Sequence, residues 1–177
     1  MRWGRRGVGL ACVLVLVKVA SAQVPRGPDI YFAATRQPVV DQMLMLAEVK
    51  PGEVVVDLGS GDGRILILAA QKYGARGMGV EINAELVERS RLIAREAEVG
   101  DRVSFVHGDL FDADVTGADV VTLYLSPSIN SELEPKLRRQ LKPGARVVSH
   151  QFPIGQWAPD RTTPGVDGTD LHLWIIK

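Results

Sequence analysis

The sequence has a single cysteine, Cys12, and only three histidines, which lie far apart in the chain. One cysteine excludes a disulfide framework within the chain. Its place in the first 22 residues leaves the remainder without a thiolate nucleophile or a cysteine metal site. His107, His150 and His172 have none of the spacings that bind zinc. We therefore expect no metal centre.

The sequence also lacks an excess of positive charge, because 21 lysines and arginines face 21 aspartates and glutamates. Four of the basic residues and none of the acidic ones lie in the first 22 positions, which leaves 17 basic against 21 acidic residues over 23–177, a net charge of −4. A surface that binds nucleic acid needs a surplus of lysine and arginine. We therefore expect no nucleic acid partner.

No apolar run reaches the roughly 20 residues that a membrane-spanning helix needs. Residues 1–22 combine a basic start, a short apolar stretch interrupted by Lys18, and a small-residue "ASA" that ends at Ala22. This pattern is typical of a cleavable secretory signal peptide, and an uncleaved N-terminal anchor is the alternative. We expect an exported, periplasmic protein without a stable span after cleavage, a membrane-anchored one if the segment is retained, and a cytoplasmic one if translation starts later.

Residues 23–177 have the length of one domain, and strand-like apolar runs alternate with helical patterns in it. Strands are predicted at 53–59, 77–82, 102–109, 118–125, 145–152 and 170–177, with 157–163 as a candidate partner of the last. Helices are predicted at 39–47, 64–73, between Asn83 and Gly100, and at 131–141 with Pro135 near its first turn. The alternation predicts an α/β, doubly wound, Rossmann-like fold, whose mostly parallel sheet of six or seven strands includes an antiparallel C-terminal strand.

A glycine-rich loop follows the first predicted strand in "VVVDLGSGDGRI" (54–65). In a doubly wound sheet this loop lies at the carboxyl ends of the strands, where ligands bind. Its spacing is G-x-G-x-G, whereas dinucleotide sites have G-x-G-x-x-G, and Asp62 would repel a pyrophosphate. The loop therefore favours a cofactor that has no phosphate and carries positive charge. S-adenosylmethionine, a sulfonium, meets both conditions.

Two further acidic residues end the next predicted strands. Glu81 lies 24 residues after Asp57, where an acid can accept hydrogen bonds from both ribose hydroxyls. Asp109 is placed to accept from the adenine amino group, with Leu110 beside the ring. Each residue alone also fits an ordinary structural role, such as a tight turn, a surface charge or a helix cap. Their occurrence at three successive strand ends favours a cofactor site.

With these motifs the sequence resembles the class I S-adenosylmethionine-dependent methyltransferases. Within that class it resembles the small lysine methyltransferases of the ATP-synthase c subunit and the adenine nucleotide translocase, and their bacterial relatives. The resemblance runs from about Asp29 to Asp160 and is carried by "VVDLGSGDGRI", "GVEIN", "GDLF", "LYLSPS" and "GARVVSHQFPIGQW". It implies a single class I methyltransferase domain over 23–177 that methylates a lysine side chain of a protein.

The resemblance also implies roles for individual residues. The cofactor would contact Tyr31, Thr35, Asp57, Gly59, Gly61, Asp62, Gly63, Glu81, Ile82, Asp109 and Leu110. The acceptor would meet a loop that contains Tyr124, Ser126, Pro127 and Ser128. A strand end followed by a helix start is the structural alternative for that loop. Because the sequence offers no evident general base, we expect Tyr124, Ser126 and backbone carbonyls to orient the amine while water takes its proton.

Two other functions stay open from the sequence. The first is methylation of a small amine, since compact relatives of this class act on small molecules. The second is an exported module that binds a ligand without catalysis, because S-adenosylmethionine is made in the cytoplasm. The presence of Asp57, Glu81 and Asp109 counts against a decayed cofactor site.

Overall fold

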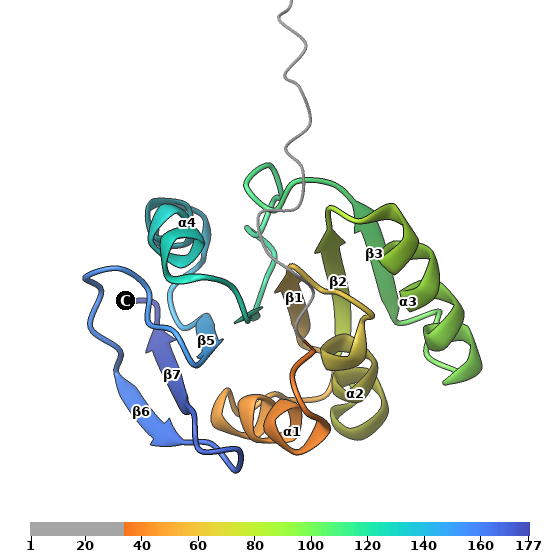
Figure 1. The fold of residues 1–177 in the computed structure, drawn as a ribbon, viewed down its shortest axis with the longest axis horizontal. Helices are drawn as coiled ribbons and strands as arrows, with labels where there is room; N and C mark the ends of the chain where they lie inside the picture. The colour runs from red at the N-terminus through yellow and green to blue at the C-terminus, as the bar shows by residue number, and fades with distance from the viewer. Residues whose placement is uncertain (1–33) are drawn as a thin grey trace, which may run out of the picture.

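A seven-stranded sheet runs through the computed structural model of the chain, which describes residues 34–177 (Figure 1). The strands are β1 Val54–Leu58, β2 Arg76–Glu81, β3 Val103–His107, β4 Val120–Leu123, β5 Arg146–His150, β6 Arg161–Pro164 and β7 Asp170–Ile175. The helices are α1 Gln37–Leu46, α2 Arg64–Tyr73, α3 Ala84–Glu96 and α4 Pro127–Gln140. None of these helices has both the length and the apolar character needed to cross a bilayer. The predicted segment 1–22 and the predicted cofactor contact Tyr31 lie outside the described residues.

The strands are ordered β3-β2-β1-β4-β5-β7-β6 across the sheet. Strands β1 to β5 pair in parallel, whereas β7 is antiparallel to both of its neighbours, β5 and β6. The chain builds outward from β1 to β3 and then returns to place β4 on the other side of β1. This order confirms the predicted doubly wound fold and creates a topological switch point between β1 and β4.

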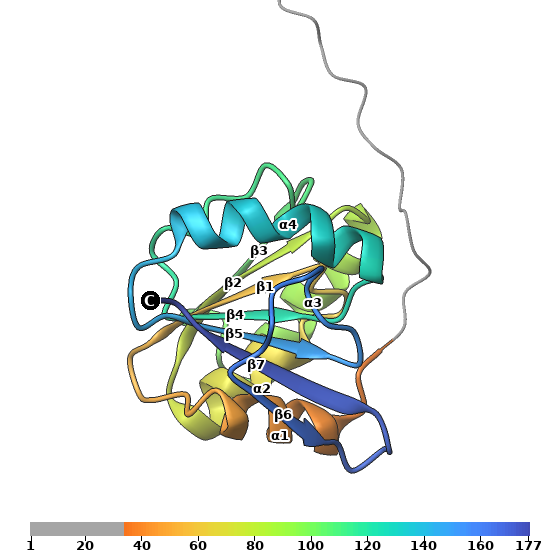
Figure 2. The same ribbon diagram turned by 90° about the vertical axis from the view of Figure 1, so that its left-hand side faces the viewer.

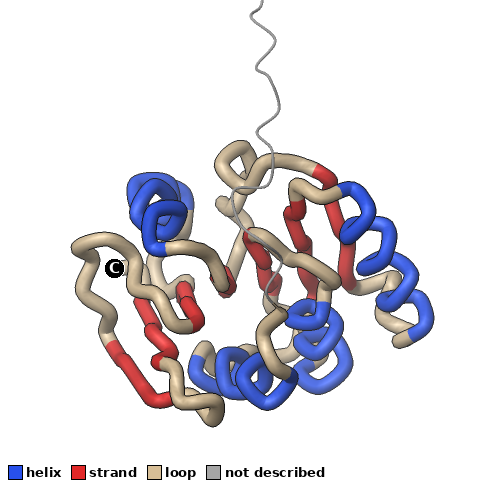
Figure 3. Tube along the Cα trace, viewed as in Figure 1, coloured by secondary structure: helices blue, strands red, loops and turns tan. Residues whose placement is uncertain are grey.

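Helices cover both faces of the sheet (Figure 2). Helices α1, α2 and α3 pack on one face and α4 packs on the other. Val55 of β1 belongs to the first core and Val56 to the second, because successive side chains of a strand point to opposite faces. Strand β1 is therefore buried on both faces, as its apolar run predicts. Figure 3 shows that the connection from β3 to β4 is a loop.

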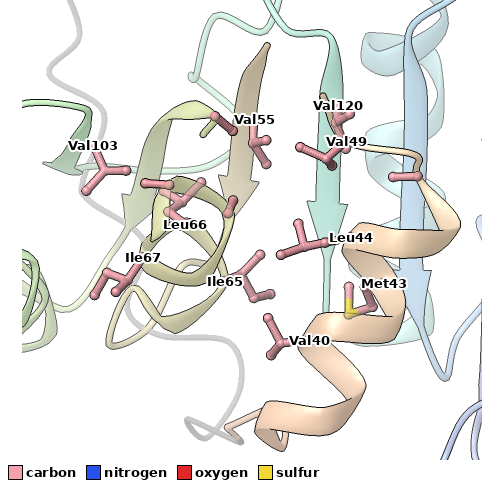
Figure 4. Close-up of a cluster of buried hydrophobic side chains, with 14 of the residues drawn as sticks. Val40, Met43, Leu44, Val49, Val55, Ile65, Leu66, Ile67, Val103 and Val120 are labelled. Carbon is pink, nitrogen blue, oxygen red and sulfur yellow. The ribbon is translucent and has the colours of Figure 1, made fainter. Parts of the chain in front are cut away.

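Aliphatic side chains hold α1 and α2 against the sheet (Figure 4). Val40 and Leu44 of α1 and Ile65 of α2 belong to one cluster with Val55 and Val120 of the strands. All five are at most 5% exposed. Burial of each such side chain contributes about 1.5–3 kcal/mol. This packing fixes the start of α2, and so it fixes the glycine-rich loop that leads into that helix.

Helix α4 begins four residues before the predicted helix 131–141. Ser126 is its N-cap and Pro127 takes the first helical position, where a missing N–H costs nothing. Pro135, expected near the first turn, instead lies inside the helix. Pro127 and Ser128 therefore belong to the first turn of α4, so the backbone at these positions is the helix start given as the alternative and not the expected loop.

Strands β6 and β7 form a hairpin at one end of the sheet. The predicted partner segment 157–163 overlaps β6, which spans Arg161–Pro164, while residues 151–160 form turns and irregular chain. The hairpin brings the number of strands to seven, the larger of the two expected numbers. Its turn carries Asp167 back to the end of β5.

Candidate active site

A pocket lies at the carboxyl ends of β1, β2 and β4, beside the switch point. Ten of the predicted site residues line it: Thr35, Asp57, Gly59, Gly61, Asp62, Glu81, Ile82, Asp109, Leu110 and Tyr124. Four others within the described chain do not line it: Gly63, Ser126, Pro127 and Ser128. The topology therefore gathers most of the residues predicted to bind the cofactor into one cavity.

Asp57 lies at the end of β1 with its side chain buried. Its Oδ1 accepts a hydrogen bond of 2.7 Å from Thr122 Oγ1, its register partner on β4. Burial raises the pKa of Asp57 to about 7, although the hydrogen bond from Thr122 acts to lower it. The nearby carboxylates of Glu81 and Asp62 raise this pKa further. A cation in the pocket would relieve this repulsion and favour the ionised carboxylate.

Asp62 forms a two-point ion pair with Arg64 at the start of α2. The Nε atom of Arg64 lies 2.8 Å from Oδ1 of Asp62, and Nη2 lies 2.6 Å from Oδ2. Nη1 of Arg64 donates to the carbonyl oxygen of Thr35 at 2.9 Å. Burial acts to raise the pKa of Asp62, but the hydrogen bonds and charge of Arg64 outweigh burial and lower it. Arg64 therefore keeps Asp62 ionised and ties the segment before α1 to the glycine-rich loop.

Glu81 holds the glycine-rich loop from the end of β2. Its Oε2 accepts from the backbone N–H of Gly61 at 2.9 Å, and its Oε1 accepts from the N–H of Asn83 at 2.9 Å. A carboxylate has about four lone-pair positions, so both oxygens retain acceptor capacity. Glu81 can therefore shape the loop and still accept hydrogen bonds from ribose hydroxyls, the role predicted from its position.

Asp109 lies in the loop after β3, beside an apolar part of the pocket. Its Oδ1 accepts from the backbone N–H of Phe111 at 2.9 Å. Ile82, Leu86, Leu110 and Phe111 also line the pocket. An apolar slot with one polar acceptor suits a flat base that carries an amino group. The predicted adenine contacts, Asp109 and Leu110, are thus in one place with Ile82.

The predicted acceptor segment contributes Tyr124 to the pocket, together with Leu125. Ser126 and Ser128 have their hydroxyl oxygens 2.9 Å apart at the start of α4. The structural alternative, a strand end followed by a helix start, describes this backbone correctly. An acceptor role for Ser126, Pro127 and Ser128 stays a prediction.

Gly63 is a packing residue at the start of α2. Its φ is +80°, and a Cβ at this position would lie 2.5 Å from Cζ of Phe105 and 2.9 Å from Cβ of Ser90. Contacts this short between carbon atoms are repulsive. Only glycine allows α2 to lie this close to the side chains of β3 and α3. The pattern of three glycines therefore combines pocket lining at Gly59 and Gly61 with helix packing at Gly63.

Arg64, Thr122 and His150 are among the residues of the site and its surroundings that escaped the sequence analysis. Arg64 lies two residues after Asp62, and this spacing could have indicated their ion pair. Thr122 is a polar residue within the apolar run 118–125, and this could have indicated its role. His150 had no such signal, because its partners Asp167 and Thr169 reach it through the hairpin turn.

The residues present fit S-adenosylmethionine better than a dinucleotide. Among the described residues that line the pocket, Arg64 is the single lysine or arginine, and Asp62 already engages it. The carboxylates around the glycine-rich loop attract a sulfonium and repel a pyrophosphate. The loop would hold the amino-acid part of the cofactor, Glu81 the ribose and Asp109 the adenine.

Known proteins similar to this chain transfer methyl groups. The family model described as the ANTKMT methyltransferase domain matches residues 57–161. A protein-lysine N-methyltransferase of Saccharolobus islandicus is 40% identical, over 84% of this chain and 95% of its own length. The adenine nucleotide translocase lysine N-methyltransferase of Mus musculus is 38% identical, over 95% of this chain and 73% of its own.

A solved structure shows the same arrangement of elements. It is described as an RNA methyltransferase from Salinibacter ruber in complex with S-adenosylhomocysteine, and it is 54% identical with a TM-score of 0.79. The match covers 81% of this chain and 94% of that one. These similar proteins agree on methyl transfer, and their names differ in the acceptor, which is a protein lysine in two cases and RNA in the third.

Proposed function

This chain belongs to the ANTKMT methyltransferase family, and we propose that it transfers a methyl group from S-adenosylmethionine to the side-chain amine of a lysine in a protein. One observation carries the choice of acceptor: the chain spans 95% of the length of a protein-lysine N-methyltransferase at 40% identity. Family membership establishes an S-adenosylmethionine-dependent methyltransferase, so a binding module without catalysis is no longer the better explanation.

The chain's own residues would bind and orient the reactants. The cofactor supplies a methyl group that positive sulfur makes electrophilic. Asp57, Glu81 and Asp109 would hold it across the carboxyl ends of three strands. Tyr124 and Leu125 would face the incoming amine, which must approach in line with the methyl group. A lysine amine has a pKa of about 10.4 in water, and an apolar, cation-bearing pocket lowers that value and favours the reactive neutral form.

RNA is the second candidate acceptor, because the 54% identical structure is described as an RNA methyltransferase. Charge argues against it: residues 23–177 carry 17 basic and 21 acidic residues, a net charge of −4. The pocket itself is lined by four acidic residues and one arginine. RNA binding depends on neutralising phosphates, which this balance does not favour. A small amine is a third candidate that the fold allows.

The place of action is a further proposal. Residues 1–22 have the pattern of a signal peptide or an N-terminal anchor, which supports export or membrane attachment of the methyltransferase. Sequencing the N-terminus of the protein purified from its native host would test this. A mature chain that begins near Gln23 would support cleavage, and one that begins at Met1 would contradict it.

The acceptor can be tested with the full chain and S-adenosylmethionine labelled in its methyl group. Poly-L-lysine, total RNA and the small-molecule filtrate of a cell extract would be separate acceptors, with Asp57→Ala as the inactive control. We expect label in poly-L-lysine, released as N-methyllysine on acid hydrolysis. Label confined to RNA or to the filtrate would overturn the lysine proposal. Calorimetric titration with S-adenosylhomocysteine would show separately whether the pocket binds its cofactor.

A further inference from the structure

A buried histidine lies directly behind two of the residues that line the pocket. His150 ends β5 and is 3% exposed. Thr35 and Tyr124 line the pocket and also contact His150: Thr35 Oγ1 lies 3.4 Å from its Nδ1, and the ring centroids of Tyr124 and His150 are 4.2 Å apart. The imidazole is therefore one side chain away from the space where an acceptor would bind.

Hydrogen bonds determine which ring nitrogen of His150 carries the hydrogen. Its Nε2 lies 2.8 Å from Thr169 Oγ1 and 3.2 Å from Asp167 Oδ2. Thr169 donates its hydroxyl hydrogen to Asp167 Oδ1 at 2.7 Å, so both neighbours of Nε2 offer only lone pairs to it. A neutral ring then carries its hydrogen on Nε2, and Nδ1 keeps a free lone pair that points to Thr35.

Thr35 is held in place between His150 and the glycine-rich loop. Its carbonyl oxygen accepts from Nη1 of Arg64 at 2.9 Å, and the same guanidinium binds Asp62. The Thr35 hydroxyl can accept one proton and donate another, which makes it a link between the pocket and the imidazole.

We propose that His150 takes the proton of the acceptor amine through the Thr35 hydroxyl, and that Asp167 and Thr169 orient its ring for this task. The inference rests on the proposed function, because it assumes an ammonium group in the pocket. His150 acts through Thr35, so it is a positioning and proton-accepting residue rather than a direct contact of the acceptor. In this proposal His150 replaces the water that the sequence analysis expected to take the proton.

The step balances without a further reactant. An N–H bond of the ammonium breaks, and its electron pair stays on nitrogen while the proton passes to Oγ1 of Thr35. The hydrogen already on Thr35 passes to Nδ1 of His150. The products are a neutral amine, whose electron pair can attack the methyl carbon, and an imidazolium stabilised by Asp167. The imidazolium later returns its proton to solvent.

The charges around His150 suit a proton acceptor. Burial lowers the pKa of His150, although the charge of Asp167 and its hydrogen bond act to raise it. Hydrogen bonds from Thr169 lower the pKa of Asp167, so its carboxylate is ionised and can stabilise an imidazolium. Tyr124 faces the ring from the end of β4, and Arg64 is separated from it by Thr35. The imidazole is therefore neutral and able to accept near pH 7.

His172 offers a matched control on the neighbouring strand. It is also buried, but Ser149, not His150, is its register partner, so it lies on the opposite face of the sheet. Its Nδ1 and Nε2 lie 3.0 Å from Thr162 Oγ1 and 3.3 Å from the carbonyl oxygen of Gln151. Replacing it should leave proton transfer in the pocket unchanged.

The kinetic test compares His150→Gln with His172→Gln in the full chain, with poly-L-lysine as acceptor. Glutamine can keep the donor toward Asp167, but it has no basic nitrogen that can take up a proton. We expect His150→Gln to lower kcat about 100-fold near pH 7, and the deficit to shrink toward about pH 10, where the amine loses its proton unaided. The KM for S-adenosylmethionine should stay within about twofold. A kcat near that of His172→Gln at pH 7, or an equal deficit at every pH, would overturn the proposal.

A second measurement does not depend on activity. Long-range 1H–15N correlation spectra of the uniformly labelled protein report which imidazole nitrogen carries hydrogen. We expect His150 with hydrogen on Nε2 near pH 7, and a shift of its Nδ1 resonance in Thr35→Val. Hydrogen on Nδ1 overturns the proposal even if no acceptor is found. If the spectra place the hydrogen on Nε2 but poly-L-lysine is not methylated, the proton-accepting role of His150 is supported. Only the proposal of a lysine acceptor is then contradicted.

Discussion

Asp57 is a buried carboxyl group that lines the pocket. Its pKa in the folded chain is about 7, against 3.8 for an unperturbed aspartate. A pKa raised by folding means that the protonated form is favoured in the folded state. The stabilisation that results is complete below about pH 4 and is lost as the pH rises through about 7.

Replacing Asp57 with asparagine should remove this pH dependence in the ligand-free protein. Between about pH 5 and 7 we expect the wild-type free energy of unfolding to fall by about 2 kcal/mol more than that of Asp57→Asn. Asparagine keeps the acceptor for Thr122 and does not titrate. Urea denaturation at the two pH values measures the difference. An equal change in the free energy of unfolding between the two pH values for both proteins would show that Asp57 is ionised throughout.

Gly63 and Gly52 separate the effect of backbone conformation from that of packing. Their φ values are similar, +80° for Gly63 and +83° for Gly52. A Cβ at Gly63 would lie 2.5 Å from Phe105, whereas a Cβ at Gly52 would have no atom within 4 Å. We expect Gly52→Ala to cost about 1–2 kcal/mol of unfolding free energy for conformation alone. Gly63→Ala should cost about 1–3 kcal/mol more, because the core must move.

Thermal or urea denaturation of both glycine variants checks this difference, and Phe105→Leu in the Gly63→Ala background supplies the control. The smaller side chain should recover part of the stability lost at Gly63. Equal losses in the two single variants would contradict a packing role for Gly63.

At the scale of elements, the start of α4 has an observed structural role and a predicted role in acceptor binding, which a pair of substitutions can separate. Ser126 caps this helix, because its Oγ accepts from the backbone N–H of Ile129. Ser126→Ala should lower the free energy of unfolding by about 0.5–2 kcal/mol, and Ser126→Asn should restore most of it because asparagine also caps helices. Methyl transfer to poly-L-lysine is then measured in both variants.

If Ser126 also orients the amine, both variants should lose activity although the asparagine variant is stable. If activity is lost in Ser126→Ala but kept in the more stable Ser126→Asn, Ser126 acts only as the helix cap. Either result decides the acceptor role predicted from "LYLSPS".

The elements that the sequence predicted well are those with a local signal. The apolar run before Asp57 identified β1, and the glycines after it identified the ligand end of that strand. The helix at 127–140 was predicted to start late because Pro135 was taken for its first turn, although Pro127 occupies that position. A proline is compatible with a first turn at either place, so composition alone did not distinguish them.

The interactions that the sequence did not predict are long-range. His150 meets Asp167 only because β7 returns antiparallel to β5, and Thr35 meets His150 across 115 positions of the chain. Spacing rules describe neighbours on one helix or strand and carry no information on such pairs. The packing role of Gly63 likewise depends on Phe105 of another strand.

At the scale of the whole molecule, the chemistry and one of the main ion pairs lie at opposite ends of the strands. Arg146 begins β5, donates to both carboxylate oxygens of Glu53, and also donates to the carbonyl oxygen of Ala47 after α1. The pocket lies at the other, carboxyl end. Stability and cofactor binding should therefore respond separately to substitutions at these two ends.

Arg146→Met should lower the free energy of unfolding by about 1–3 kcal/mol, because it removes the guanidinium from the mostly covered Glu53 carboxylate and from the Ala47 carbonyl oxygen. Among the described residues, Glu53 then keeps only the hydrogen bond from the backbone N–H of Lys50. Lys72→Met, which breaks the more exposed pair with Asp41, should cost less than about 1 kcal/mol. Urea denaturation measures both. The dissociation constant of S-adenosylhomocysteine should stay within about twofold in each variant; a large change would show that the two ends are coupled.

The contact of Arg64 with both Asp62 and the Thr35 carbonyl oxygen joins the glycine-rich loop to the chain before α1. Neither segment can move away without breaking the hydrogen bonds that it accepts from this guanidinium. Their backbone amides should therefore exchange hydrogen with deuterated solvent in a single opening event, and a ligand that seats on the loop should protect both segments by the same factor. In this molecule, cofactor binding and ordering of the chain beside the acceptor would then be one event.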